Sequence, residues 1–426
     1  MSRWSFLTHT QLHEVLFHFL GGEGILNFRA IHSSCDALVL HFAQTQLQDV
    51  MGQDLSMTVL AGEDFGKRCR TIDPALVVLL LRQGQNIGQL FATSAAGVRS
   101  LTRCLYSSDS TVKAFDSTIE MATADWAHTL VHVDICGAAN ASDDFVSLLA
   151  CCDSPLVSLD VSMTGRNITD MSVMLVVRSC RKLRYLNVCD SAITDDSIKI
   201  VAEGCPELEL LDVSCTAGRI TDYAIKLVAL KCHSLQVLDV SFTDGKISDE
   251  SIKLVAQNCP RLRSLNVNGT EGSITDESIK RIAASGSLET LHICSTAGRI
   301  TDDSMKVVAA NCPRLKSLNA SWTEGKITDG SMKLVALNCV ELRALYVSGT
   351  QAKITDASIK LVAMHCLQLR SLDVSYTEGG ITDESISLVA ANCRSLQYLE
   401  VSCTCGEVTR SWAALLPPGC ECTDDL

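Results

Sequence analysis

The stretch Ile300–Ala320, ITDDSMKVVAANCPRLKSLNA, decides the fold of this 426-residue chain, because close copies of it recur along much of the sequence. Each copy combines the pattern L-x-x-L-x-V with a polar turn and the motif I-T-D. Successive copies begin 25 to 27 residues apart, a period typical of solenoid repeats. Their first leucines are Leu156, Leu183, Leu208, Leu235, Leu262, Leu288, Leu315, Leu342, Leu369 and Leu396, with weaker copies at Leu130 and Leu101.

Each copy reads as one short strand followed by one helix. Counted from the first leucine, the apolar residues at positions one, four and six point inward from the strand. Residues 247–259, ISDESIKLVAQNC, then read as a helix that Ser248 or Asp249 caps and that ends before Pro260. The apolar face of that helix consists of Ile252, Val255 and Ala256.

One strand and one helix cannot bury their apolar faces alone, so about eleven units are expected to stack into one continuous core. The quoted stretch resembles the cysteine-containing class of leucine-rich repeats, in which C-P-x-L precedes the strand and I-T-D opens the helix. This resemblance spans roughly residues 125 to 412. It implies an α/β solenoid, a horseshoe with parallel strands on the concave face and helices on the convex face.

Composition restricts the classes of partner. Hydrophobic residues make up 47% of the chain but aromatic residues only 5%, so the core must be aliphatic. The net charge of -13 favours a neutral or basic protein partner and argues against nonspecific binding to nucleic acid. The longest aliphatic run, Ala75–Leu81, is too short to span a membrane, and the first residues lack the pattern of a signal peptide. We therefore expect a cytoplasmic protein, with the nucleus as a second compartment.

Cysteine is abundant, with 21 residues. Eight of them precede a strand leucine by three residues: Cys180, Cys205, Cys232, Cys259, Cys312, Cys339, Cys366 and Cys393. A residue that recurs once per repeat forms a ladder, whereas metal ligands must converge on one point. We therefore expect small buried core residues, no metal site and no disulfide framework.

Residues 1–45 do not fit the repeat, and their apolar residues follow helical spacing. They resemble the F-box, a helical module that docks on the Skp adaptor of cullin-based ubiquitin ligases, although Cys35 stands where that family has a late tryptophan. The resemblance implies adaptor binding through Leu12, Leu16, Leu20, Ile25, Phe28 and Ile31. The alternative is a helical cap that only seals the first repeat. We assign residues 46–100 to a helical linker or N-terminal cap, 101–416 to the repeats and 417–426 to an acidic tail.

Two repeat positions are candidates for partner binding. Strand alternation directs position five towards the concave surface, and position eight varies most and lies at the strand end. The residues expected to bind are Asp212, Asp239, His292, Tyr346, Asp373 and Glu400 at position five, and Phe242, Trp322 and Tyr376 at position eight. The alternatives are an ordinary solvated sheet face at position five and packing against the turn at position eight.

No catalytic motif is found, and neither a phosphate-binding glycine loop nor a nucleophile with a base can be named. The expected function is therefore protein binding without a cofactor. The resemblance implies a substrate receptor of an SCF-type ubiquitin ligase, with an Skp-type adaptor and a cullin as further partners. The alternative is a leucine-rich-repeat scaffold or inhibitor that has no part in a ligase. Neither reading involves a membrane or nucleic acid.

Overall fold

In a computed structural model of the chain, the described residues are 132–134, 136, 143, 146, 156–164, 167–404, 408–409 and 411–423. The chain divides into two compact units, Met1–Leu183 and Arg184–Leu426, which we describe separately. The segments expected to form the F-box-like module and the linker, residues 1–45 and 46–100, lie outside the described residues.

The described part of the first unit contains the weaker copy that begins at Leu130 and the regular copy that begins at Leu156. Strand β1 (His132–Asp134) pairs in parallel with β2 (Ser158–Asp160), with Val133 opposite Leu159. Helix α9 (Asp170–Ser179) follows, and Val173, Val176 and Val177 are buried on one of its faces. The copy that begins at Leu130 therefore supplies a strand of the same kind as the regular repeats.

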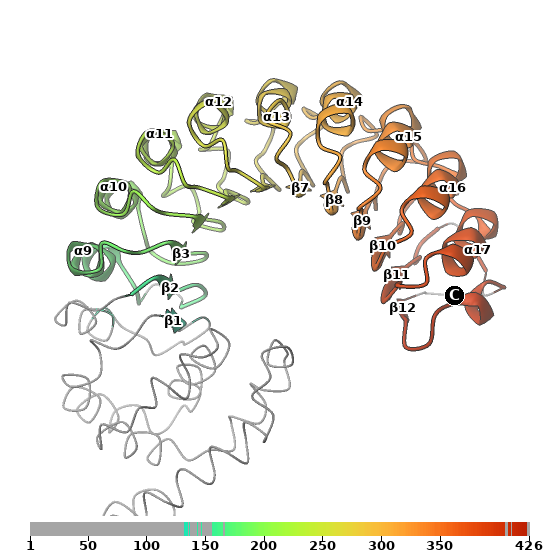
Figure 1. The fold of residues 1–426 in the computed structure, drawn as a ribbon, viewed down its shortest axis with the longest axis horizontal. Coiled ribbons are helices and arrows are strands. Elements are labelled where there is room, and N and C mark those ends of the chain that lie inside the picture. Colours follow the sequence, from blue (N-terminus) through green and yellow to red (C-terminus); the bar gives the residue numbers. More distant parts are fainter. Residues whose placement is uncertain are drawn as a thin grey trace, which may run out of the picture. The chain divides into compact units, whose positions relative to one another are not determined.

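The second unit is an α/β leucine-rich-repeat solenoid. Figure 1 shows its strands along the inner side of a curve and its helices along the outer side. In the part of this unit that the structure describes, ten parallel strands pair in sequence order. The strands are β3 (Tyr185–Asn187), β4 (Leu210–Asp212), β5 (Val237–Asp239), β6 (Ser264–Asn266), β7 (Thr290–His292), β8 (Ser317–Asn319), β9 (Ala344–Tyr346), β10 (Ser371–Asp373), β11 (Tyr398–Glu400) and β12 (Glu421–Thr423). The helices are α10 (Asp195–Gly204), α11 (Asp222–Lys231), α12 (Asp249–Asn258), α13 (Asp276–Ala283), α14 (Asp302–Asn311), α15 (Asp329–Asn338), α16 (Asp356–His365) and α17 (Asp383–Asn392), followed by the short helix η2 (Ala413–Leu415).

The strands have the phase that the sequence predicts. Each strand of a regular repeat covers positions three to five, and its central residue is buried. In β8, Leu318 is completely buried, whereas Ser317 and Asn319 on either side of it are partly exposed. The leucines at positions one and four and the residue at position six therefore form the core, as expected.

Helix α12 shows how the sequence starts and stops each helix. Ser248 is the N-cap, and its hydroxyl accepts a hydrogen bond from the Glu250 N–H at 3.3 Å. Ile252 and Val255 are buried as predicted, but Ala256 is only half-buried. The helix ends at Asn258, after which the Cys259 N–H donates to the Val255 carbonyl.

The aspartate of each I-T-D motif joins its repeat to the next one. The Asp302 carboxylate accepts hydrogen bonds from the Thr328 N–H at 2.8 Å, the Thr328 hydroxyl at 2.6 Å and the Ser331 hydroxyl at 2.5 Å. Thr328 is the N-cap of the following helix, so one carboxylate fixes the start of the neighbouring helix. The aspartates of the second unit that bind the next N-cap residue in this way form an aspartate ladder: Asp195, Asp222, Asp249, Asp276, Asp302, Asp329 and Asp356. Asp383 binds Thr409 with the same geometry, although none of the described helices begins there.

Two members of this ladder, Asp249 and Asp276, make the fold sensitive to acid. Burial alone would raise the pKa of Asp249, but hydrogen bonds from Ser278 and Thr275 outweigh burial and lower the pKa below its ordinary value of 3.8. The pKa of Asp276 is lowered for the same reasons. Because the folded pKa is depressed, each carboxylate stabilises the fold fully above the unfolded pKa and loses this contribution as the pH falls through the folded pKa.

We expect Asp302→Ala to lower the free energy of unfolding by about 3 kcal/mol, because it removes the acceptor of three part-buried hydrogen bonds from the next repeat. The matched control is Asp303→Ala, which removes the exposed neighbouring carboxylate and should change the free energy by less than about 0.5 kcal/mol. Urea unfolding followed by circular dichroism measures both variants. Equal losses of stability would contradict the role of the aspartate ladder.

The cysteine ladder is part of the core. All eight cysteines named in the sequence are at most 2% exposed, which confirms the prediction that they are buried. The Cys259 thiol donates to the Cys232 carbonyl of the preceding repeat at 3.5 Å. Burial raises the pKa of Cys232 and Cys259 to about 12, so both remain neutral thiols near pH 7.

The C-terminal segment closes the repeats. Trp412 and Val408 are buried and fill the end of the core. Strand β12 pairs in parallel with β11, with Cys422 opposite Leu399, so part of the segment 417–426 that was expected to be a tail adds a strand to the sheet. The side chains of β12 are exposed, and the strand depends on backbone hydrogen bonds to the sheet edge instead of an apolar pattern.

Candidate protein-interaction surface

Figure 1 shows the strands on the concave side of the second unit. Their pairing in register places the predicted position-five residues of neighbouring strands next to one another. Asp212 lies opposite Asp239 on the neighbouring strand, and Asp373 lies between Tyr346 and Glu400. His292 lies opposite Asn319 and contacts the Ser317 hydroxyl at 3.2 Å. Burial lowers the pKa of His292, which favours its neutral form near pH 7.

The acids in this row also hold the turns that follow their strands. One oxygen of Asp239 accepts hydrogen bonds from the N–H and the hydroxyl of Ser241, at 2.9 and 2.6 Å. The other oxygen accepts a hydrogen bond from the Asn266 side chain at 2.7 Å. Asp212, Asp373 and Glu400 bind the serine two residues later in the same way. These carboxylates are therefore structural acceptors as well as a source of negative potential.

Position three is a part of this surface that the sequence reasoning missed. Strand alternation places it on the same face as position five, and its side chains are half-buried in most strands. It carries Tyr185, Leu210, Val237, Ser264, Thr290, Ser317, Ala344, Ser371 and Tyr398. The two-residue period of a strand was the signal that could have identified it.

Position eight has an unusual backbone conformation. Phe242, Trp322 and Tyr376 have φ angles of 52°, 54° and 53°, in the left-handed region that bulky residues rarely adopt. The same conformation recurs at Met163, Asp190, Cys215, Gly269, Ser295, Gly349 and Cys403. The turn of the repeat therefore imposes the left-handed conformation. It holds the aromatic side chains at the end of the strand at some cost in backbone energy.

Two of these aromatic rings lie over glycines of the next repeat. A Cβ atom at Gly349 would lie 2.5 Å from the Trp322 ring, and one at Gly269 would lie 2.4 Å from the Phe242 ring. Trp322 also meets Tyr376, with ring centroids 5.5 Å apart and a tilt of 46°. Aromatic residues two repeats apart can therefore touch because glycine stands between them.

The aromatic pair borders a pocket of about 370 Å³. Trp322 is 48% exposed and Tyr376 is 47% exposed, so both rings present a large apolar area to solvent. The pocket is lined by Trp322, Glu324, Gly349, Gln351, Tyr376, Glu378 and Cys403. Exposed aromatic rings beside a pocket are frequent anchors of protein interfaces, so this is the strongest candidate site on the described surface.

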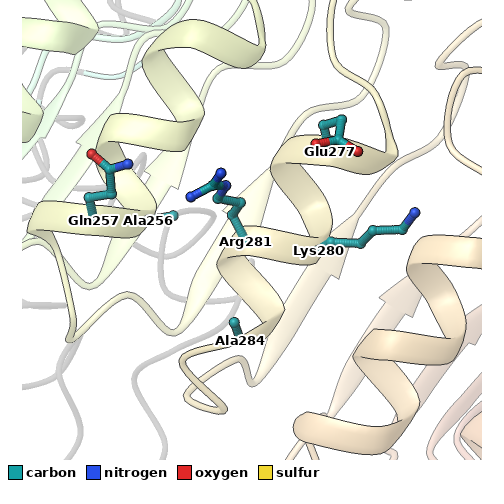
Figure 2. A pocket seen from close by; sticks show the side chains of 6 residues that line it. All are labelled: Ala256, Gln257, Glu277, Lys280, Arg281 and Ala284. Atoms are coloured by element: carbon teal, nitrogen blue, oxygen red, sulfur yellow. The ribbon is translucent and has the colours of Figure 1, made fainter.

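A second hollow, of about 410 Å³, lies between α12 and α13. Figure 2 shows Arg281 pointing from α13 into the gap towards Gln257, whereas Lys280 points away from it. The hollow mixes acidic, basic and amide groups and contains no exposed aromatic ring. It therefore offers a partner no clear anchor.

Among the residues that the structure describes, no three histidine, cysteine, aspartate or glutamate side chains could jointly hold a metal ion. Within the same residues, no helix has both the length and the apolar character needed to cross a bilayer.

The sequence matches no protein-family model and no curated protein. Among solved structures, the fold is similar to that in the crystal structure of the Rad7 and Elc1 complex in yeast. The TM-score is 0.55 at 19% identity, and the match covers 82% of this chain and 92% of that one. The leucine-rich repeat-containing protein LegL7 from Legionella pneumophila matches with a TM-score of 0.38 at 15% identity, covering 60% of this chain and 86% of the other. The likeness to the first of these structures concerns the fold alone.

Proposed function

We propose that this protein is a substrate receptor of an SCF-type ubiquitin ligase. The repeats hold the target protein, and residues 1–45 dock on an Skp-type adaptor that links them to a cullin. The protein contributes proximity, and the bond-forming chemistry belongs to other subunits. It is therefore not itself an enzyme and needs no cofactor.

The observation that carries the binding role is the pair of half-exposed aromatic rings at one edge of the solenoid. Nearly half of Trp322 and of Tyr376 remains in solvent, in a chain whose aromatic content is only 5%. The left-handed backbone at this position recurs in the other described repeats, but the joint exposed apolar area of two contacting rings does not, and such an area favours a role in binding.

The ligase part of the proposal depends on the order of modules. An F-box-like segment followed by leucine-rich repeats is the layout of the receptors that the sequence resembles. A solved structure with a similar fold holds Rad7 in complex with Elc1, so that protein assembles with a second chain. The competing proposal is a free-standing scaffold or inhibitor, which would use the same repeats without an adaptor.

Binding of an adaptor separates the two proposals. We expect the purified full-length protein to bind a purified Skp-type adaptor, and the double variant Leu20→Ala, Ile31→Ala to weaken this binding by roughly tenfold or more, because it removes two apolar contacts. The Trp322→Ala variant is the control and should bind the adaptor normally. If the full-length protein binds no such adaptor, the scaffold proposal replaces the ligase proposal. If the double variant binds as well as the wild type, the docking surface is not in residues 1–45.

A further inference from the structure

We infer that the pocket floored by Gly349 and bordered by Trp322 and Tyr376 binds one arginine side chain of the partner protein. This inference rests on the proposed role of the repeats in holding a partner and is independent of the adaptor. It specifies which chemical group of the partner Trp322 and Tyr376 recognise.

The floor and the walls of the pocket suit a flat cation. Gly349 has a φ of 63° and no side chain, so the Trp322 ring packs closely against its backbone and is held at the pocket. The rings of Trp322 and Tyr376 are tilted by 46°, and they offer adjoining faces instead of a closed sandwich. A planar guanidinium can stack on such a face and retain its edge for hydrogen bonds.

Two carboxylates give the pocket a negative charge that is complementary to a bound cation. Glu324 and Glu378 line the pocket with the amide of Gln351, and no lysine, arginine or histidine lines it. Both glutamates are exposed, and neither forms an ion pair among the residues described in the structure. A cation placed over the rings would therefore meet acidic groups that have no basic partner of their own.

Glu378 lines the pocket and follows Tyr376 by two residues, so it is the carboxylate chosen for the test. Side chains at position ten of the repeat, where Glu378 stands, extend towards the preceding repeat. A Cβ atom at Gly325 would lie 3.1 Å from Oε1 of Gln351, and one at Gly298 would lie 2.9 Å from Oε2 of Glu324. For Glu378 the residue at the corresponding place in the preceding repeat is Ala352, three residues after Gly349, and both Glu378 and Gly349 line the pocket.

A partial copy of the arrangement elsewhere in the chain supports this specificity. Phe242 lies over Gly269 as Trp322 lies over Gly349. In that copy, however, Ser295 stands at the position of Tyr376 and Ala297 at the position of Glu378. That copy therefore lacks both the second aromatic ring and the carboxylate that Glu378 supplies. Only the pocket at Trp322 combines two rings, a glycine floor and a carboxylate within the described repeats.

The test compares arginine with citrulline, which has nearly the same shape but no charge. The probes are the peptides acetyl-Gly-Arg-Gly-amide and acetyl-Gly-citrulline-Gly-amide, titrated against the full-length protein by ligand-observed NMR. We expect the arginine peptide to bind at least about fivefold more tightly than the citrulline peptide, because only the arginine peptide interacts with the carboxylates. Glu378→Gln should reduce this preference, and Gly349→Ala should weaken binding of both peptides by displacing the Trp322 ring.

Glu271→Gln is the matched control. Glu271 is an exposed acid at the same repeat position but outside the pocket, so its loss should leave arginine binding unchanged. Equal binding of the two peptides overturns the inference, as does an effect of Glu271→Gln as large as that of Glu378→Gln. No binding of the arginine peptide up to roughly 10 mM also overturns it. Tighter binding of the corresponding lysine peptide would reassign the pocket to an ammonium group. None of these outcomes affects adaptor binding, so the ligase proposal is tested separately.

Discussion

Replacing Leu318 with alanine is expected to lower the free energy of unfolding of the repeats by about 2–5 kcal/mol. Leu318 is completely buried at the centre of β8, with Leu291 and Leu345 directly opposite it on the two neighbouring strands. Those strands are fixed by parallel pairing on both sides, so they cannot move in to fill the cavity that the substitution leaves. Urea unfolding of the full-length protein, followed by circular dichroism, measures the loss.

Asn319→Ala, one residue further along the strand, is the control. Asn319 is half-exposed on the concave face, and its side chain accepts a hydrogen bond from the Ser321 N–H at 3.1 Å. Loss of this bond should lower the free energy of unfolding by about 1 kcal/mol. If the two substitutions are equally destabilising, the assignment of inward and outward positions along β8 is incorrect.

The regular parts of the fold were predictable because they depend on local periodicity. The spacing of apolar residues in L-x-x-L-x-V determines which side of the strand faces inward, and it correctly predicted that Leu318 is buried and that Asn319 is not. The helix after Ile247 was also predictable from its apolar face and its capping residues.

Contacts between repeats were harder to predict. The sequence suggested Asp249 or Ser248 as a helix cap, but it did not reveal that Asp249 binds Thr275 and Ser278 of the next repeat. Those donors lie 26 and 29 residues away, and only the stacking geometry brings them together. Strand β12 was missed for a similar reason, since its pairing with β11 requires no apolar pattern of its own.

The candidate site was predictable in its residues but not in its construction. Variation at position eight indicated Trp322 and Tyr376, and the structure brings these two rings into contact. The role of Gly349 depends on a left-handed backbone and on the direction in which the Trp322 ring leans, and neither follows from spacing. The acids at position five lie side by side on neighbouring strands, for example Asp212 and Asp239, where like charges repel. In the structure, neighbouring serine and asparagine side chains donate hydrogen bonds to these carboxylates, as Ser241 and Asn266 do to Asp239.

The double variant Trp322→Ala, Tyr376→Ala is expected to abolish capture of the target while leaving adaptor binding intact. Exposed aromatic anchors often contribute on the order of 2 kcal/mol each, so their joint loss should weaken target binding by roughly a thousandfold. The two rings lie in the repeats, whereas the proposed adaptor-docking residues lie in residues 1–45. Quantitative co-precipitation with an Skp-type adaptor, together with mass spectrometry of the proteins retained, measures both activities in the same sample.

Deletion of residues 1–45 should give the opposite result, with loss of the adaptor and retention of the target. Tyr223→Ala provides the control for the double variant, because Tyr223 is a 52% exposed aromatic residue on α11, away from the pocket. It should leave both activities unchanged. If the deletion variant also loses its target, residues 1–45 act as a structural cap of the repeats, and the proposed domain boundary near residue 45 is incorrect. If the double aromatic variant retains its target, the partner binds elsewhere on the solenoid, and the acidic row on the concave surface becomes the next candidate.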